Sequence, residues 1–207
     1  MSFMARVVAC FPLTHILFVI SMTLSFIWNP SLISAIAVLF AIYGFPLLSF
    51  HLHNVFFPLK EGLTDFGVKS YNPWWGAYQI QIIFFSFPAL EAVLILIPGL
   101  FSQWLRLWGS RVGRNVYFAP RFEVLDRSLL QVGDNVVFGA NVAMSQHAIT
   151  PRKKSLYLYV RKIEIGDGAF IGAESRIGPG VKIDAGVRLG YRTYVAAGKK
   201  LRLEKSS

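Results

Sequence analysis

A six-residue pattern runs through the second half of this 207-residue chain. An apolar residue followed by a small one recurs in a single phase, and weaker members keep that phase. Neither a helix, with about 3.6 residues per turn, nor a strand, with a period of two, generates this spacing, so each hexamer is expected to be one short strand plus a corner of a coiled ribbon. The strong pairs are Val112-Gly113, Val132-Gly133, Phe138-Gly139, Ile165-Gly166, Ile171-Gly172, Ile177-Gly178 and Leu189-Gly190, and the weaker members are Phe118, Val124, Met144, Ile183 and Val195.

The repeat predicts a parallel β-solenoid in which three hexamers form one triangular coil. The large apolar residue points inward and stacks on its equivalent in the next coil, and the small residue lets the backbone turn the corner. The first coil carries two extra residues after Val124. Eighteen residues then make one turn, which gives about four coils, at 112–131, 132–149, 165–182 and 183–200.

The repeat is interrupted once, between Met144 and Ile165, which lie twenty-one positions apart. The segment 150–164 has lost the alternation of apolar and small residues. An insertion cannot enter the packed interior of a solenoid, so we expect an extruded loop at one edge, where functional residues usually lie.

The first half of the chain is expected to lie in a membrane. Residues 7–28 contain no charged residue, and a second uncharged run extends from Leu32 to about Phe50. Each is long enough to cross a hydrocarbon core of about 30 Å, so we expect a transmembrane hairpin at about 7–50. A cleaved signal peptide is the alternative for the first run, but its apolar part would be too long and no small-x-small cleavage site precedes Asn29.

Residues 71–108 are apolar as well, but they are divided. Pro88 and Pro98 interrupt the stretch and Glu91 lies in its middle, so no piece crosses a bilayer unaided. We expect interfacial or re-entrant helices here, and a third full span that bends at the prolines is the alternative. The flanking tryptophans, expected at the headgroup level, are Trp74, Trp75, Trp104 and Trp108.

These features predict three regions. A membrane-embedded helical region covers 1–108, a hexapeptide-repeat domain covers 109–200, and a basic tail follows at 201–207. The single cysteine, Cys10, lies in the first apolar run and excludes an intramolecular disulfide.

Charge follows the same division, because the net charge of +10 lies entirely in the second half. The predicted outer turn at 29–31 has no Lys or Arg, whereas basic residues flank the other side of the hairpin. The positive-inside rule then places both termini and the solenoid in the cytoplasm, at the inner membrane of a bacterium. Nucleic acid is excluded as a partner on the absence of a reading motif, and phosphate-bearing cofactors and lipid headgroups suit the charge better.

His147 is the only histidine of the solenoid and lies where the repeat gives way to the inserted segment. Its neighbours Ser145, Gln146 and Thr150 are polar, so we expect a groove at the coil edge. There an imidazole can take a proton from a hydroxyl or amine that attacks an acyl thioester. The alternative is an ordinary surface histidine at a turn.

Counting along the repeat places Asp126 beside this histidine. Val124 and Met144 hold equivalent inward positions one coil apart, which puts Asp126 and Arg127 one step below Gln146 and His147, about 5 Å away. Asp126 would accept a hydrogen bond from His147 Nδ1 and leave Nε2 as the base. The alternative is a corner residue paired with Arg127 or Arg121.

The hexamers, the histidine at the loop junction, and the segments VGDNVVFG (132–139) and IGDGAFIG (165–172) resemble the left-handed β-helix hexapeptide acyltransferases, especially the xenobiotic acetyltransferase branch and its membrane-anchored relatives. The resemblance covers about residues 109–200. It implies a left-handed winding, a homotrimer, and acetyl-CoA or another acyl-CoA in a groove between two solenoids. It also implies that the loop of one subunit covers the site and that His147 is the general base.

The same resemblance suggests residues that hold the donor. The backbone amides of Gly172, Ala173 and Gly190 would approach the pantetheine arm. Four cations would pair with phosphates, and the alternative for each is a solvated surface residue. They are Arg176, Arg192, Lys199 and Lys200.

Together these features predict a membrane-anchored acyltransferase. It would move an acyl group, with acetyl as the first candidate, from acyl-CoA to a hydroxyl or amine of a lipid, a lipid-linked sugar or another membrane-proximal acceptor. A non-catalytic trimeric membrane scaffold or complex subunit on a degenerate solenoid is the alternative. The γ-type carbonic anhydrases share this solenoid, but their zinc needs three imidazoles, so we expect no metal.

Overall fold

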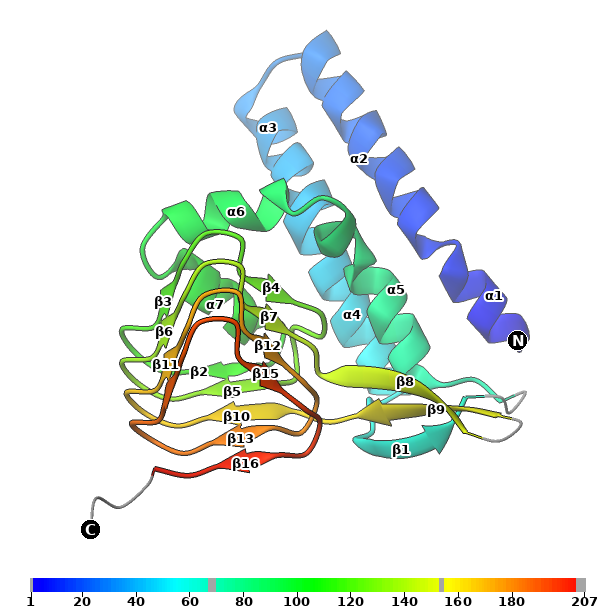
Figure 1. Cartoon of the computed structure of the whole chain (residues 1–207). Coiled ribbons are helices and arrows are strands. Elements are labelled where there is room, and N and C mark those ends of the chain that lie inside the picture. Colours follow the sequence, from blue (N-terminus) through cyan, green and yellow to red (C-terminus); the bar gives the residue numbers. More distant parts are fainter. Residues whose placement is uncertain (1, 67–69, 153–154, 204–207) are drawn as a thin grey trace. The chain divides into compact units, whose positions relative to one another are not determined.

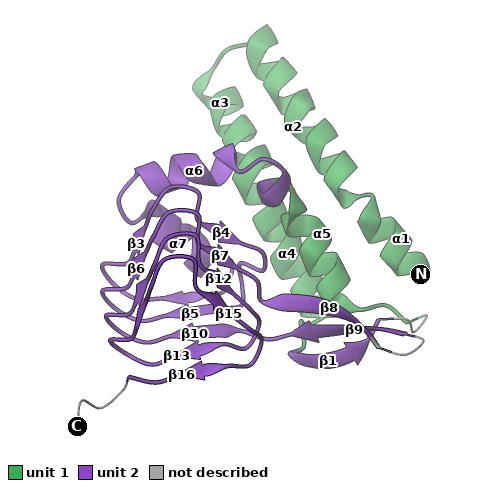
Figure 2. Ribbon diagram, in the orientation of Figure 1, with its two compact units in different colours: residues 1–60, 69–83 green, residues 61–68, 84–207 purple. Residues whose placement is uncertain are grey.

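A computed structural model of the chain describes residues 2–66, 70–152 and 155–203 (Figure 1). It divides into two compact units, the first made of residues 1–60 and 69–83 and the second of residues 61–68 and 84–207 (Figure 2). The units therefore do not follow the boundary that the sequence suggested at residue 108. Part of the expected membrane region belongs to the same unit as the solenoid.

The first unit is helical, and two of its stretches are long and apolar enough to cross a membrane, namely Phe3–Trp28 and Leu32–Phe56. Only 6% and 11% of their apolar windows are buried within the chain, which suits contact with lipid. A capping box at Ser31 begins the second stretch. The elements are α1 (Phe3–Ala9), α2 (Phe11–Trp28), α3 (Leu32–Leu39), the π-helix η1 (Phe40–Gly44), α4 (Phe45–Phe56) and most of α5 (Pro73–Ser86).

One buried polar contact joins the two apolar stretches. His15 Nε2 lies 2.9 Å from the backbone oxygen of Ala41, which is part of the π-helix η1. A histidine inside an apolar hairpin needs a polar partner. The carbonyl oxygen that His15 contacts belongs to a π turn, where the regular pattern of helical hydrogen bonds is altered. His15 therefore has a structural role within the first unit.

Helices α5 and α6 (Ala89–Leu96) have the combined length of a span but bend by 74° at the break between them. Pro88 lies at the N-cap of α6, so the proline predicted to interrupt the stretch does so. A broken span and a re-entrant segment both remain compatible with this geometry.

The second unit is built on three parallel sheets that wind around one core, which confirms the parallel β-helix (Figure 1). One sheet has five strands and the other two have four each. The first contains β2 (Arg111–Val112), β5 (Leu130–Val132), β10 (Ile163–Ile165), β13 (Lys182–Ile183) and β16 (Lys200–Leu201). The second contains β3 (Tyr117–Phe118), β6 (Val137–Phe138), β11 (Phe170–Ile171) and β14 (Arg188–Leu189), and the third β4 (Glu123–Val124), β7 (Ala143–Met144), β12 (Arg176–Ile177) and β15 (Tyr194–Val195).

The pairing register reproduces the six-residue phase of the sequence. Equivalent hexamer residues are Cα partners in neighbouring strands, and their side chains are buried in the interior. The three inward columns are Val112, Val132, Ile165 and Ile183; Phe118, Phe138, Ile171 and Leu189; and Val124, Met144, Ile177 and Val195.

Helix α7 (Leu100–Leu107) covers the open end of this core at the first coil. The Phe101 ring lies 4.9 Å from that of Phe118, measured between centroids. Trp104 and Trp108 are 4% and 0% exposed, so their rings are buried within the chain. A terminal coil of a solenoid needs a cap over its apolar interior, and at the first coil these rings provide part of it.

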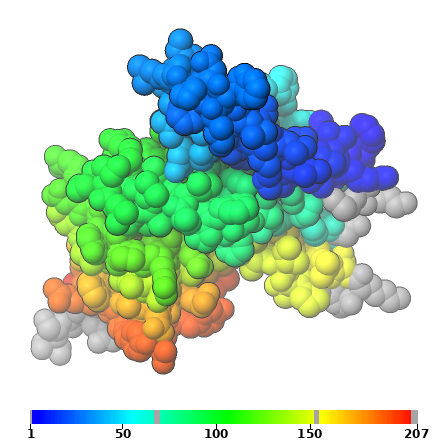
Figure 3. All heavy atoms as spheres, turned by 90° about the horizontal axis from the view of Figure 1, so that it is seen from above, coloured from blue at the N-terminus to red at the C-terminus, as the bar shows by residue number. Residues whose placement is uncertain are grey.

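The inserted segment is a regular β-hairpin and not an irregular loop. Strands β8 (His147–Arg152) and β9 (Ser155–Val160) pair antiparallel, and β1 (Gly62–Asp65) adds a third strand to the free edge of β9. In Figure 3 this hairpin, in yellow, projects from the stacked coils. Residues 153–154 of the predicted 150–164 loop and residues 204–207 of the predicted tail lie outside the described residues.

The glycines of the repeat give a test of coil packing. A Cβ on Gly172 would collide with the backbone carbonyl groups of Gly190 and Leu189 in the next coil, whereas a Cβ on Gly190 meets nothing closer than Thr193 Oγ1 at 4.0 Å. We expect Gly172→Ala to destabilise the folded state by about 1–3 kcal/mol and Gly190→Ala to be much milder. Thermal unfolding of the full-length protein in detergent, followed by circular dichroism, measures both, and equal midpoints would contradict the packing described.

Candidate functional site

His147 lies at the point where the hairpin leaves the solenoid. It follows β7 by a short turn and is the first residue of β8, where it is the Cα partner of Val160 in β9. Ser145 Oγ donates to the His147 carbonyl oxygen at 2.7 Å, and the Arg161 amide donates to the carbonyl oxygen of Gln146 at 2.8 Å. These hydrogen bonds hold the two ends of the hairpin together beside His147.

His147 and Asp126 form a hydrogen-bonded pair, as the repeat predicted. His147 Nδ1 lies 2.6 Å from Asp126 Oδ2, and the two side chains are 13% and 2% exposed. The Asp126 amide also donates to Gln146 Oε1 at 3.0 Å, which holds the aspartate from its backbone. The alternative partner Arg127 binds Glu91 instead.

This arrangement has the chemistry of a general base. A buried carboxylate that accepts from Nδ1 fixes the tautomer in which Nε2 carries the lone pair, and it stabilises the imidazolium that forms when Nε2 takes a proton. A hydroxyl or amine that reached Nε2 would become a stronger nucleophile.

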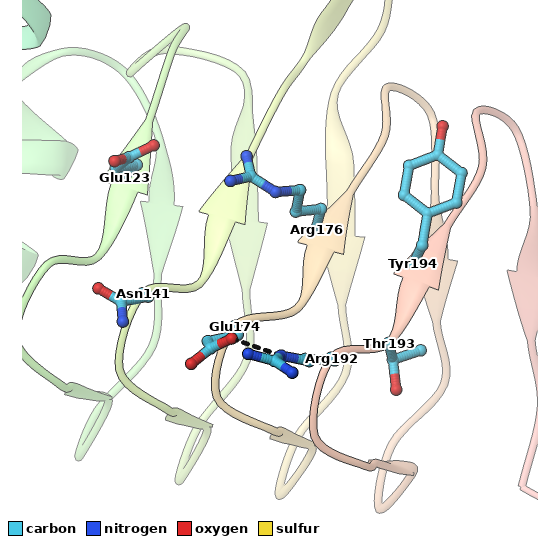
Figure 4. Close-up of a pocket in the computed structure, with 7 residues that line it drawn as sticks. All are labelled: Glu123, Asn141, Glu174, Arg176, Arg192, Thr193 and Tyr194. Atoms are coloured by element: carbon cyan, nitrogen blue, oxygen red, sulfur yellow. Dashed lines mark hydrogen bonds and ion pairs between the residues drawn. The ribbon is translucent and has the colours of Figure 1, made fainter.

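A cavity of about 510 Å³ on the outer side of the third sheet brings together two of the predicted donor-binding residues, Arg176 and Arg192 (Figure 4). Arg192 Nε lies 2.7 Å from Glu174 Oε2 at the corner before β15. Arg176 has no ion-pair partner among the residues that the structure describes. The remaining lining residues, which sequence reasoning missed, are Glu123, Asn141, Glu174, Thr193 and Tyr194.

The predicted backbone donors behave differently. The Gly172 amide already donates to the Leu189 carbonyl oxygen at 3.0 Å, so it is not available to a ligand, which corrects the expectation for this residue. Ala173 and Gly190 lie in corners, where their carbonyl oxygens accept from the Arg192 amide and from Ser175 Oγ. Lys199 is exposed and lies outside the lining of the cavity.

Electrostatics separate the two arginines of the cavity. The hydrogen bond from Arg192, and a second from Tyr191, hold the pKa of the Glu174 carboxyl below its ordinary value of 4.5. Arg192 is therefore already matched to a carboxylate. Arg176 is the better candidate for a ligand anion.

The sequence reasoning missed a buried ion pair. Glu91 of α6 and Arg127 approach to 2.6 Å, and their side chains are 8% and 1% exposed. Trp104 Nε1 also donates to Glu91 Oε1, at 2.8 Å. A signal was present, since Glu91 is the sole charged residue between Lys69 and Arg106 and a buried carboxylate requires a cation.

Within residues 2–66, 70–152 and 155–203, no group of three or more His, Cys, Asp and Glu side chains is arranged to hold a metal ion. The candidate site of the described chain is therefore an imidazole and a carboxylate at the hairpin junction, with a separate cavity on the third sheet.

Comparison with known proteins supports the nature of the repeat. The family model "Bacterial transferase hexapeptide (six repeats)" matches residues 162–197, which contain strands β10 to β15. This segment of the solenoid therefore has the hexapeptide pattern that the family model describes. No curated protein sequence matches the chain.

Three solved structures that match part of the chain are described as acetyltransferases. A hexapeptide-repeat containing acetyltransferase from Vibrio cholerae is 14% identical, with 57% of this chain and 86% of that chain covered and a TM-score of 0.38. A galactoside acetyltransferase in complex with coenzyme A is 18% identical, with 54% and 74% covered and a TM-score of 0.38. A maltose O-acetyltransferase from Clostridium difficile is 20% identical, with 55% and 72% covered and a TM-score of 0.25. These scores are too low to assign an activity to this chain.

The Glu174–Arg192 pair gives a pH-dependent prediction. Because the folded pKa of Glu174 is lowered, the pair stabilises the folded state above the ordinary carboxyl pKa and loses that contribution as the pH falls through the lowered value. We expect Arg192→Gln to raise the Glu174 pKa in a ¹³C NMR titration and to cause a small loss of stability that disappears in acid. Arg188→Gln, on the exposed face of β14, is the control, and an unchanged Glu174 pKa in Arg192→Gln would refute the assignment.

Proposed function

We propose that this protein is an acyltransferase in which His147 is the general base and Asp126 orients it. The observation that carries this proposal is the buried 2.6 Å contact between His147 Nδ1 and Asp126 Oδ2 at the edge of a hexapeptide-repeat solenoid. Such a pair fixes the tautomer and the orientation of the imidazole, which suits proton abstraction by Nε2.

In the proposed reaction His147 Nε2 takes the proton of an acceptor hydroxyl or amine while the acceptor oxygen or nitrogen attacks the thioester carbonyl. Asp126 stabilises the imidazolium through the Nδ1 hydrogen bond. His147 then returns the proton to the departing thiolate as the carbon–sulfur bond breaks, which leaves an ester or amide and a free thiol. No net proton or electron is gained by the protein.

The donor that we propose is acetyl-CoA or another acyl-CoA. Arg176 is the residue that would bind an anionic group in the cavity on the third sheet, because it has no ion-pair partner in the described chain and lies beside the hydroxyl groups of Thr193 and Tyr194. The cavity also contains two carboxylates, Glu123 and Glu174, and Glu174 pairs with Arg192. CoA would supply the activated acyl group as a thioester. In a homotrimer, as the resemblance implies, a left-handed solenoid of a second copy would complete the groove.

The acceptor that we propose is a lipid, a lipid-linked sugar or another molecule at the membrane surface. The two long apolar helical stretches support a membrane anchor, and tethering raises the local concentration of such acceptors. We place the protein at the inner membrane of a bacterium with the solenoid in the cytoplasm, on the distribution of basic residues in the sequence. A trimeric scaffold without catalysis is the competing function.

Replacing His147 by Ala tests the central role. We expect transfer of radiolabelled acetyl from acetyl-CoA to bacterial membranes to fall by about 10²–10⁴-fold, the range of general-base catalysis, while the protein still folds. His51→Ala, which removes an exposed histidine of α4, is the control and should retain activity. Retained transfer in His147→Ala would show that this residue is not the base. A wild-type protein that neither transfers acetyl nor gains thermal stability with CoA would support the scaffold function.

Replacing Arg176 by Ala tests the donor cavity. Loss of one charge-assisted contact to a phosphate, about 1.5–3 kcal/mol where it is well formed, should raise KM for acetyl-CoA by roughly tenfold or more and leave kcat nearly unchanged. Arg188→Ala is a matched control, because Arg188 holds the equivalent outward position on a neighbouring sheet. Equal KM values for the two variants would exclude this cavity as the donor site.

A further inference from the structure

The corner between β4 and β5 places two consecutive charged residues in two separate pairs. Asp126 turns to His147, and Arg127 turns to Glu91 on α6. Both Arg127 contacts are 2.6 Å long, from Nε to Glu91 Oε1 and from Nη2 to Glu91 Oε2. Three charged side chains, Glu91, Arg127 and Asp126, are thus withdrawn from water next to the candidate base.

Several contacts fix the Arg127 guanidinium on the side of α6. Glu91 binds it with both carboxylate oxygens, a bidentate geometry that sets the orientation of the planar group. The Phe84 ring centroid lies 5.2 Å from the guanidinium carbon. Ser110 Oγ donates to the Arg127 carbonyl oxygen at 2.6 Å and accepts from the Leu130 amide, so the backbone of this corner is held as well.

A buried guanidinium needs a carboxylate, and Glu91 determines which one it takes. If Glu91 lost its charge, the carboxylate of the adjacent Asp126 would become a partner for Arg127. Glu123, which lines a cavity with Arg127 and Arg121, would be the second. If Arg127 paired with the Asp126 carboxylate, the hydrogen bond between Asp126 and His147 would be broken or weakened.

We propose that Glu91 is a positioning residue for the candidate base: it holds Arg127 away from Asp126 and so keeps the Asp126 carboxylate for His147. This inference rests on the proposed function, because it concerns the base of that reaction. It also makes the orientation of His147 depend on how α6 is seated on the solenoid. The same helix exposes 53% of Val93 and 79% of Leu96, so its outer face is apolar.

The contact itself can be measured without turnover. In full-length protein labelled with ¹⁵N-histidine, His147 of the wild type should show the strongly downfield Nδ1 proton of an imidazole bound to a carboxylate. We expect Glu91→Gln, which keeps the shape but removes the charge, to weaken or abolish that signal. Glu61→Gln is the matched control, because it removes the exposed Glu61 carboxylate that pairs with Lys162 at the base of the hairpin. An unchanged signal in folded Glu91→Gln would overturn the inference.

Removing the charges of both Glu91 and Arg127 distinguishes a positioning role of Glu91 from a purely structural one. In Glu91→Gln/Arg127→Met no cation competes for Asp126, so we expect the His147 signal to return. If Glu91 only holds the helix in place, the double variant should be no better than the single one. This variant also decides the matter if Glu91→Gln alone fails to fold, since a folded double variant without the signal would overturn the inference.

Kinetics add an independent readout on acetyl transfer from acetyl-CoA to bacterial membranes. Misplacement of the base should lower kcat of Glu91→Gln on the order of 10- to 100-fold with little change in KM for acetyl-CoA, and the double variant should recover most of it. A change confined to KM would contradict a positioning role. Retained transfer in His147→Ala would refute the proposed function instead, and the NMR result would still decide whether Glu91 protects the Asp126–His147 contact.

Discussion

The in-register stacking of inward apolar residues is the constraint on which the second unit depends. Each inward column places one side chain of every coil directly on its equivalent in the next, so the backbone of each coil hydrogen-bonds to its neighbours on three faces. A shift of the phase by one residue would turn an entire column outward. Because the phase of the inward columns is fixed, extra residues can be accommodated only at corners. The charged and polar groups of the candidate site lie at the two corners that contain such residues.

The two lengthened corners lie one above the other on the same edge of the solenoid. The first carries Asp126 and Arg127, and the second carries Gln146, His147 and the hairpin. The parallel pairing of β4 with β7 sets the distance between them, because Val124 and Met144 are direct Cα partners. The catalytic pair that we propose therefore depends on sheet register, which is a more rigid reference than a loop.

The sequence predicted the solenoid and the His147–Asp126 contact for one reason: a strict repeat converts sequence distance into spatial distance. Where the repeat stops, this conversion fails. The pairing of β1 with β9 joins residues about ninety positions apart, and nothing periodic connects them. Trp104, Trp108 and Glu91 were read as membrane-facing or as interruptions because an apolar segment looks the same whether lipid or a solenoid end covers it. Their burial in the second unit is a tertiary effect that local hydropathy does not encode.

The buried ion pair between Glu91 and Arg127 could not be predicted from hydropathy, because an apolar helix can be covered by lipid or by protein. A carboxylate in an apolar helix is costly in lipid and costly in a protein core, so its presence alone does not say where the helix lies. The distinguishing feature is a cation at the matching place, and Arg127 is found in the first of the two lengthened corners. The extra residues let Arg127 turn toward α6 while Asp126 turns toward His147. The departure from the repeat therefore serves both contacts, because a six-residue corner would have fewer residues to direct to two opposite partners.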